Sequence, residues 1–140
     1  LDTAMKLKII LLLLCMPLLA NAGAVSQLGT GDPLKLVYQE MLYQYQVGLE
    51  LHQQYDFKQP IDVMQCKNQH GYIQTRARSM VGTANQVEEE IRSDVIDAAW
   101  FALNCSRCGS AVDSCDAVPE KLEFIKSLLE AKQKAKNLQR

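Results

Sequence analysis

The cysteines constrain the fold of this chain more than any other feature of its sequence. One cysteine, Cys15, lies in an N-terminal leader that we expect to be removed, and four more follow it. An even number of cysteines in an exported chain predicts two disulfides. The sequence alone does not select their connectivity. The four cysteines are Cys66, Cys105, Cys108 and Cys115.

Cys105 and Cys108 form a C-x-x-C motif, which is also found in three other kinds of site. Covalent haem attachment needs histidine directly after the second cysteine, where this chain has Gly109. A thiol-exchange site needs a strand that leads into a helix, and here an apolar helical segment precedes the motif. A zinc site needs reduced thiolates, usually in two spaced pairs. We therefore predict disulfides, with no cofactor and no metal.

The leader has the composition of a secretory signal peptide. Met5 is followed by two lysines, by an apolar run over residues 9–20 and by Ala-Asn-Ala at residues 20–22. Signal peptidase cuts after this small-x-small pattern, and the run is about half as long as a membrane-spanning helix. Acylation at Cys15 is disfavoured because Leu14 stands where that processing needs a small residue. Cleavage before Gly23 is the better prediction.

The sequence thus divides into three parts. Residues 1–22 are expected to be upstream residues plus a cleaved signal peptide, residues 23–31 a flexible N-terminal arm, and residues 32–140 a single helical domain in the periplasm or outside the cell. The whole chain carries 15 basic and 16 acidic side chains, for a net charge of −1. This balance favours neither nucleic acid nor an anionic membrane as a partner. We expect no membrane span once the signal peptide is cleaved.

Asp32 and Pro33 are typical of a helix N-cap and first helical position, and they predict a helix to about Tyr55. This helix is apolar on two sides. It therefore has either a central place in a bundle or an exposed face that binds a second chain. The main stripe is Leu34, Val37, Tyr38, Met41, Tyr45, Leu49 and His52, and the second stripe is Leu36, Tyr43, Val47 and Leu51.

The segment 60–104 allows two arrangements, because its apolar residues stay in helical phase throughout. One is a long helix from Tyr72 to Asn104. The other is a helical hairpin that turns at Gly82-Thr83, with Thr83 and Gln86 as a capping box. A long helix would place Cys66 far beyond disulfide reach of the other three cysteines. The hairpin is therefore favoured.

The rest of the chain completes an all-α, small disulfide-stabilised bundle of about four helices. We expect the loop 105–118 to cover the apolar end of the preceding helix, at Trp100, Phe101 and Leu103. Pro119 begins the last helix. Its predicted buried face consists of Leu122, Ile125, Leu128, Leu129 and Leu138.

No catalytic constellation emerges from the sequence. Only two histidines are present, and His52 continues the main stripe while His70 stands beside Gly71, where a local irregularity is the simpler explanation. The acidic residues of segment 88–97 form a solvated face or a surface that attracts a basic partner.

The sequence therefore predicts a non-enzymatic protein that binds another protein. Immunity proteins and inhibitors are exported helical proteins of comparable size, an analogy at the level of fold only. Two alternatives are a self-associating structural subunit, which would form a homo-oligomer, and a carrier of a small apolar ligand held by Tyr38, Met41, Tyr45 and Met80. The predicted partner-binding residues are Leu36, Tyr43, Val47, Leu51, Glu90, Asp94, Asp97 and Arg107.

Overall fold

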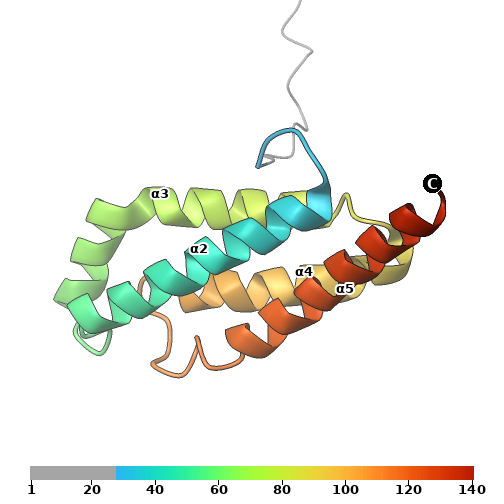
Figure 1. Cartoon of the computed structure of the whole chain (residues 1–140). Helices are drawn as coiled ribbons and strands as arrows, with labels where there is room; N and C mark the ends of the chain where they lie inside the picture. Colours follow the sequence, from blue (N-terminus) through green and yellow to red (C-terminus); the bar gives the residue numbers. More distant parts are fainter. Residues whose placement is uncertain (1–27) are drawn as a thin grey trace, which may run out of the picture.

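The computed structural model describes residues 28–140, and within this range the backbone forms four helices and no strand (Figure 1). The predicted all-α, disulfide-stabilised bundle is confirmed. The expected signal peptide and most of the expected N-terminal arm lie outside the described residues. The helices are α2 (Pro33–Gln54), α3 (Pro60–Ala84), α4 (Glu89–Cys105) and α5 (Val118–Leu138).

Helix α2 begins and ends where the sequence predicts. Asp32 accepts a hydrogen bond from the backbone N–H of Leu34 at 3.1 Å, and Pro33 follows as the first helical residue. The backbone becomes extended at Tyr55. Among the described helices, α2 contacts all three others, whereas α3 and α5 do not contact each other. The pair α2 and α4 is therefore central, which explains why α2 is apolar on two sides.

The buried face of α2 is centred between the two predicted apolar stripes. Leu51 of the second stripe is buried, whereas Leu49 of the main stripe is 41% exposed, so its predicted burial is wrong. At 100° per residue, the centre of the buried face falls on Val37, Gln44 and Gly48, and all three are buried. A polar residue and a glycine therefore lie at the centre of this face, and a second buried polar residue, Glu40, lies at its edge.

Helices α3 and α4 form the predicted hairpin, but the turn comes later than expected. Thr83 is still part of α3, and its hydroxyl donates to the Ser79 carbonyl at 2.9 Å and accepts from the backbone N–H of Leu28 at 3.0 Å. The predicted capping box of Thr83 with Gln86 is therefore wrong, because the hydroxyl is used within α3 and by the N-terminal segment. Helix α4 starts only at Glu89.

Helix α3 is kinked at His70, which has φ −123° and ψ 18° inside an otherwise helical segment. This confirms the predicted irregularity. Figure 1 shows the N-terminal part of α3 turning away from the axis of the rest of the helix. Cys66 lies in this part and is fully buried.

Two disulfides join the end of α4 to the rest of the molecule. Cys66 pairs with Cys108, with the Cα atoms 5.7 Å apart, and Cys105 pairs with Cys115, with the Cα atoms 4.4 Å apart. The predicted link between Cys66 and one of the three later cysteines is confirmed, and the long-helix alternative is excluded.

The loop 106–117 does not cover the end of α4 as predicted. Leu103 is buried and Phe101 is half-buried beneath Lys121, whose Nζ lies 4.7 Å from the ring centroid, but Trp100 remains 47% exposed. The Cys105–Cys115 disulfide folds the loop back toward α2 instead, where Ser110 and Ser114 contact His52.

Helix α5 buries only the first half of its apolar face. Leu122 and Ile125 are buried, and Leu128 and Leu129 pack against the core. Leu138 is 88% exposed, so its predicted burial is wrong. Polar contacts hold the second half of α5, because Lys132 forms ion pairs with Asp32 at 3.1 Å and with Glu88 at 2.7 Å.

The close packing at Gly48 leads to a stability prediction. A Cβ built on Gly48 would lie 2.8 Å from the carbonyl oxygen of Cys105 and would also meet its sulfur, whereas a Cβ on Gly71 meets nothing within 4 Å. We expect Gly48→Ala to lower the free energy of unfolding by about 1–3 kcal/mol through overpacking. Gly71→Ala is the matched control and should raise it by about 0.5–1 kcal/mol. Urea denaturation measures both, and a neutral Gly48→Ala would contradict the packing.

The contacts of Lys132 lead to a prediction about pH. The hydrogen bond from Lys132 is the main cause that lowers the pKa of Glu88. A carboxyl group with a lowered pKa stabilises the fold above its unfolded pKa, about 4.3, and this contribution is lost as the pH falls through the folded value. We expect Lys132→Met to raise the pKa of Glu88 in an NMR titration. Lys134→Met, which removes a neighbouring exposed charge, should leave it nearly unchanged.

Candidate protein-binding surface

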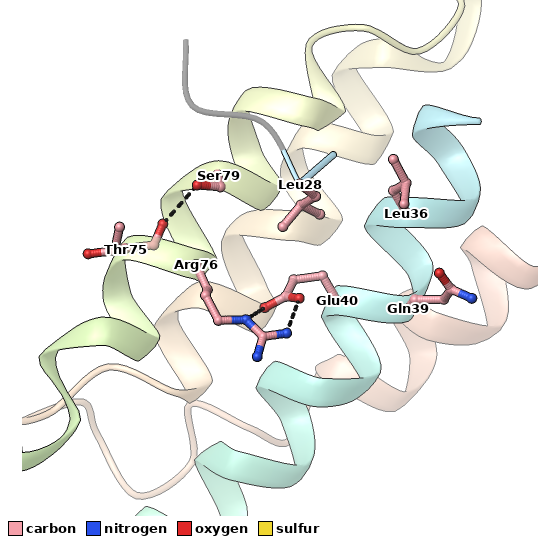
Figure 2. A pocket seen from close by; sticks show the side chains of 7 residues that line it. All are labelled: Leu28, Leu36, Gln39, Glu40, Thr75, Arg76 and Ser79. Atoms are coloured by element: carbon pink, nitrogen blue, oxygen red, sulfur yellow. Dashed lines mark hydrogen bonds and ion pairs between the residues drawn. The ribbon is translucent and has the colours of Figure 1, made fainter. Parts of the chain in front are cut away.

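A groove runs between α2 and α3 and is open to solvent (Figure 2). Its volume is about 530 Å³. In Figure 2, Arg76 of α3 reaches across the groove to Glu40 of α2, while Leu28 and Leu36 lie toward one end. The groove thus combines an apolar end with a charged centre. Its lining consists of Leu28, Leu36, Gln39, Glu40, Thr75, Arg76 and Ser79.

The centre of the groove is an ion pair between Glu40 and Arg76. The guanidinium donates two hydrogen bonds to the carboxylate, from Nε at 3.1 Å and from Nη2 at 2.7 Å. The side chain of Glu40 is only 7% exposed, whereas that of Arg76 is 46% exposed. The hydrogen bond to Glu40 is the main cause that raises the pKa of Arg76. A buried carboxylate therefore orients an arginine that is accessible from solvent.

A buried chain of polar groups holds Glu40 in place. Gln44 is fully buried, and its Nε2 donates to Glu40 Oε1 at 2.8 Å and to the carbonyl of Ile73 at 3.4 Å. The hydroxyl of Ser106 donates to Gln44 Oε1. Buried polar groups need such partners because an unpaired group costs about 1–3 kcal/mol. The chain fixes the side chain of Glu40, and Glu40 in turn fixes Arg76.

Two tyrosines extend from the arginine, one in contact with it and the other in contact with the first. The guanidinium carbon of Arg76 lies 3.7 Å from the centroid of the Tyr43 ring, and Tyr72 is 58% exposed. Burial raises the pKa of Tyr43 against the opposing effect of the Arg76 charge, and a hydrogen bond with Tyr72 adds to the rise. Both the ring face and the hydroxyl are thus held in defined positions. We call Tyr43, Tyr72 and Arg76 the Tyr–Arg cluster.

The second stripe of α2 contributes to this surface only in part. Leu36 lines the groove and Tyr43 belongs to the Tyr–Arg cluster. Val47 is half-buried and packs against a core cluster that contains Leu51, which is 2% exposed. Leu51 is therefore a core residue, and its predicted role as a contact for a partner is wrong for this structure.

The predicted acidic residues lie on another part of the molecule. Glu90 and Asp94 are exposed on α4, and Asp97 forms an ion pair with Lys121 of α5 at 2.8 Å. Asp94 and Asp97 line a cavity of about 280 Å³ that α5 closes on its other side. The fold does not bring these residues to the Tyr–Arg cluster, since they belong to the side where α4 meets α5.

Arg107 lies on a third surface. It is exposed in the loop after α4 and lines a separate cavity together with Lys67 and Arg78 of α3. The predicted partner-binding residues therefore fall on three separate surfaces and do not form one site.

His52 contacts two hydroxyl groups. Its Nε2 lies 3.1 Å from Ser110 Oγ and 3.3 Å from Ser114 Oγ, and its ring meets Phe57 edge-on. His52 is thus a hydrogen-bonded histidine in the last turn of α2. A serine nucleophile would also need a group that orients the imidazole, and in residues 28–140 no carboxylate bonds to His52.

The residues expected to hold an apolar ligand belong to the core. Met41 and Met80 are fully buried there, and Tyr38 and Tyr45 pack against the same core.

No helix in residues 28–140 is long and apolar enough to cross a membrane. The same residues contain no group of three or more His, Cys, Asp or Glu side chains placed to hold a metal ion.

No protein-family model matches this chain, and comparisons with curated proteins and with solved structures found no match.

Three residues of this site, Glu40, Tyr72 and Arg76, are not among the partner-binding residues predicted from the sequence. A signal for Glu40 was present, because Glu40 and Gln44 are four residues apart and lie between two apolar stripes. Polar residues so placed become buried and need partners. Nothing local to Tyr72 or Arg76 identifies them, since their partners lie on another helix.

The ion pair leads to a prediction by double-mutant cycle. Arg76→Met should destabilise the protein by about 1–3 kcal/mol, because it leaves the buried carboxylate of Glu40 without its partner. Adding Glu40→Leu should restore part of the loss and give a coupling energy of about 1–2 kcal/mol, below that of a fully buried pair because Arg76 is half-exposed.

The exposed pair of Glu123 and Lys126, 3.9 Å apart, is the control for this cycle. Its coupling energy should be about 0.3–0.5 kcal/mol. Equal coupling energies for the two pairs, measured by urea denaturation, would show that Glu40 does not anchor Arg76.

Proposed function

We propose that this protein is exported and binds another protein, without catalysis, through the surface formed by α2 and α3. The Tyr–Arg cluster is the centre of that surface. The single observation that carries the proposal is that the buried carboxylate of Glu40 holds the half-exposed Arg76 against the ring of Tyr43, whose hydroxyl is hydrogen-bonded to Tyr72.

The composition of the cluster supports this function. Tyrosine and arginine are among the residues that contribute most to the affinity of protein interfaces. Side chains that are already held in place lose less conformational entropy on binding. Two bonds to Glu40 and a contact with Tyr43 hold Arg76, and the guanidinium keeps donors that a backbone carbonyl of a partner can accept.

The charges of the site predict what kind of partner fits. Glu40 neutralises Arg76 within the groove, and Leu28 and Leu36 supply apolar surface at one end. A partner surface with apolar side chains and exposed carbonyl groups matches this arrangement better than a strongly charged one. The complex should therefore survive moderate salt, because screening weakens only exposed charge–charge attraction.

Export is supported by two features of the chain. The N-terminal residues have the pattern of a signal peptide, and the two disulfides persist in an oxidising compartment. A partner is thus sought in the periplasm or outside the cell. Inhibition of that partner is the specific form of the proposal, and it would be detected as a loss of the partner's activity on binding.

The test uses the mature chain, Gly23–Arg140, with its disulfides formed. A partner captured from extract of the source organism is purified, and its affinity is measured for wild type, Tyr72→Ala and Arg76→Lys. Each variant should bind about tenfold more weakly or worse. Trp100→Ala, which removes another exposed aromatic side chain, from α4, is the control and should bind as wild type does.

Other outcomes would reject the proposal in favour of a named alternative. Equal affinity of Tyr72→Ala, Arg76→Lys and wild type would exclude this surface. If the mature chain captures only further copies of itself, and light scattering shows a dimer, the self-associating subunit is favoured. Release of an apolar small molecule on solvent extraction would favour the carrier.

A further inference from the structure

A second cavity, of about 520 Å³, lies on the other flank of α3. Its α3 residues, from Val63 to Arg78, follow one another at steps of four and seven and therefore share one face of the helix. Arg76 lines the groove described above instead. The loop after α4 supplies the opposite wall. The lining consists of Val63, Lys67, Gln74, Arg78, Arg107, Cys108 and Gly109.

Three cations meet in this cavity, and its lining contains no acidic side chain. Lys67, Arg78 and Arg107 are all exposed, and in the described part of the chain none of them forms an ion pair with a carboxylate. The chain as a whole has a net charge of −1, so this concentration of positive charge is local. Such a concave cluster of one sign attracts an oppositely charged ligand.

The fold holds Arg107 against α3 by three neighbouring contacts. Cys108 is bonded to Cys66 of α3, and Gln74 Nε2 donates to the carbonyl of Ser106 at 3.2 Å. Gly109 has φ +87°, and a Cβ there would lie 3.2 Å from Val63. The residues on both sides of Arg107 are thus fixed to α3, so the backbone that carries this arginine is held at the cavity.

We propose that this cavity binds the phosphate or sulfate group of a small ester ligand. Arginine is suited to tetrahedral oxyanions because its planar guanidinium can donate two parallel hydrogen bonds. A phosphate monoester carries close to two negative charges and three acceptor oxygens, which two arginines and a lysine can match. A sulfate monoester carries one negative charge but presents the same three oxygens, whereas a carboxylate has only two oxygens to accept from the three cations.

The size of the cavity indicates an ester and not a bare ion. Small-molecule sites occupy about 300–1,000 Å³, and 520 Å³ is far more than one phosphate fills. Val63 and the Cys66–Cys108 disulfide give the cavity an apolar portion beside its cations. The group that is esterified to the anion would lie against this portion. This site is independent of the protein-binding surface, because the two share no lining residue.

Isothermal titration calorimetry of the mature, disulfide-bonded chain tests the proposal. The probes are phenyl phosphate, phenyl sulfate, inorganic phosphate and benzoate. We expect saturable 1:1 binding of at least one of the two esters, tighter than that of inorganic phosphate or benzoate. Arg107→Gln and Arg78→Gln should each weaken binding about tenfold or more, since each removes a charge-assisted hydrogen bond.

Lys134→Gln is the matched control, because it removes one exposed positive charge from α5, outside the cavity. It should leave the affinity within about twofold of wild type. The proposal is overturned if neither ester binds with a Kd below about 1 mM, or if Lys134→Gln weakens binding as much as Arg107→Gln. Arg107 is exposed on a loop, so Arg107→Gln should fold, and an unchanged Tm without ligand verifies this.

Discussion

Two disulfides converge at the end of α4, and the placement of the following loop depends on them. Cys105 and Cys108 are three residues apart, yet they bond in different directions, to Cys115 within the loop and to Cys66 on α3. By loop-closure entropy, the link that spans 42 residues contributes about 4 kcal/mol and the link that spans 10 residues about 2.5 kcal/mol. Because both bonds leave the same short segment, the loop 106–117 has little freedom to lie anywhere except against α2 and α3.

The second determinant is the composition of the buried face of α2. Gly48 lets the end of α4 approach closely, and any side chain there would meet Cys105. Glu40 and Gln44 place polar groups on the same buried face, and each finds a partner on another element. Ser106 links the loop to both helices. Its hydroxyl donates to Gln44 of α2, and its carbonyl accepts from Gln74 of α3. Such a chain of polar contacts is satisfied in this helix arrangement, and it therefore favours this arrangement over packings that would leave the same groups unpaired.

A net charge of −1 conceals a clear separation of charges over the surface. Acidic residues gather where α4 meets α5, an internally neutralised arginine lies between α2 and α3, and three cations without acidic partners lie beyond α3. The two proposed sites differ in their net charge. The Tyr–Arg cluster is neutralised by Glu40 and suits a protein surface, whereas the cavity at Arg107 keeps its charge and suits an anion. Their common support is α3, which is fixed by the core on one side and by Cys66 at its kinked end.

The sequence by itself determined the features that depend on neighbours along the chain. These are the helical class, the N-cap at Asp32, the irregularity at His70 and a hairpin required by Cys66, because capping, periodicity and disulfide reach are local or simple geometric constraints. Only the tertiary structure decided which part of α2 is buried, that Trp100 stays exposed and that Arg76 forms the centre of a site. The bonds that decide the last point join residues 36 and 62 positions apart, Arg76 to Glu40 and Ser106 to Gln44. No pattern of local spacing carries that information, because it arises only when the helices are packed together.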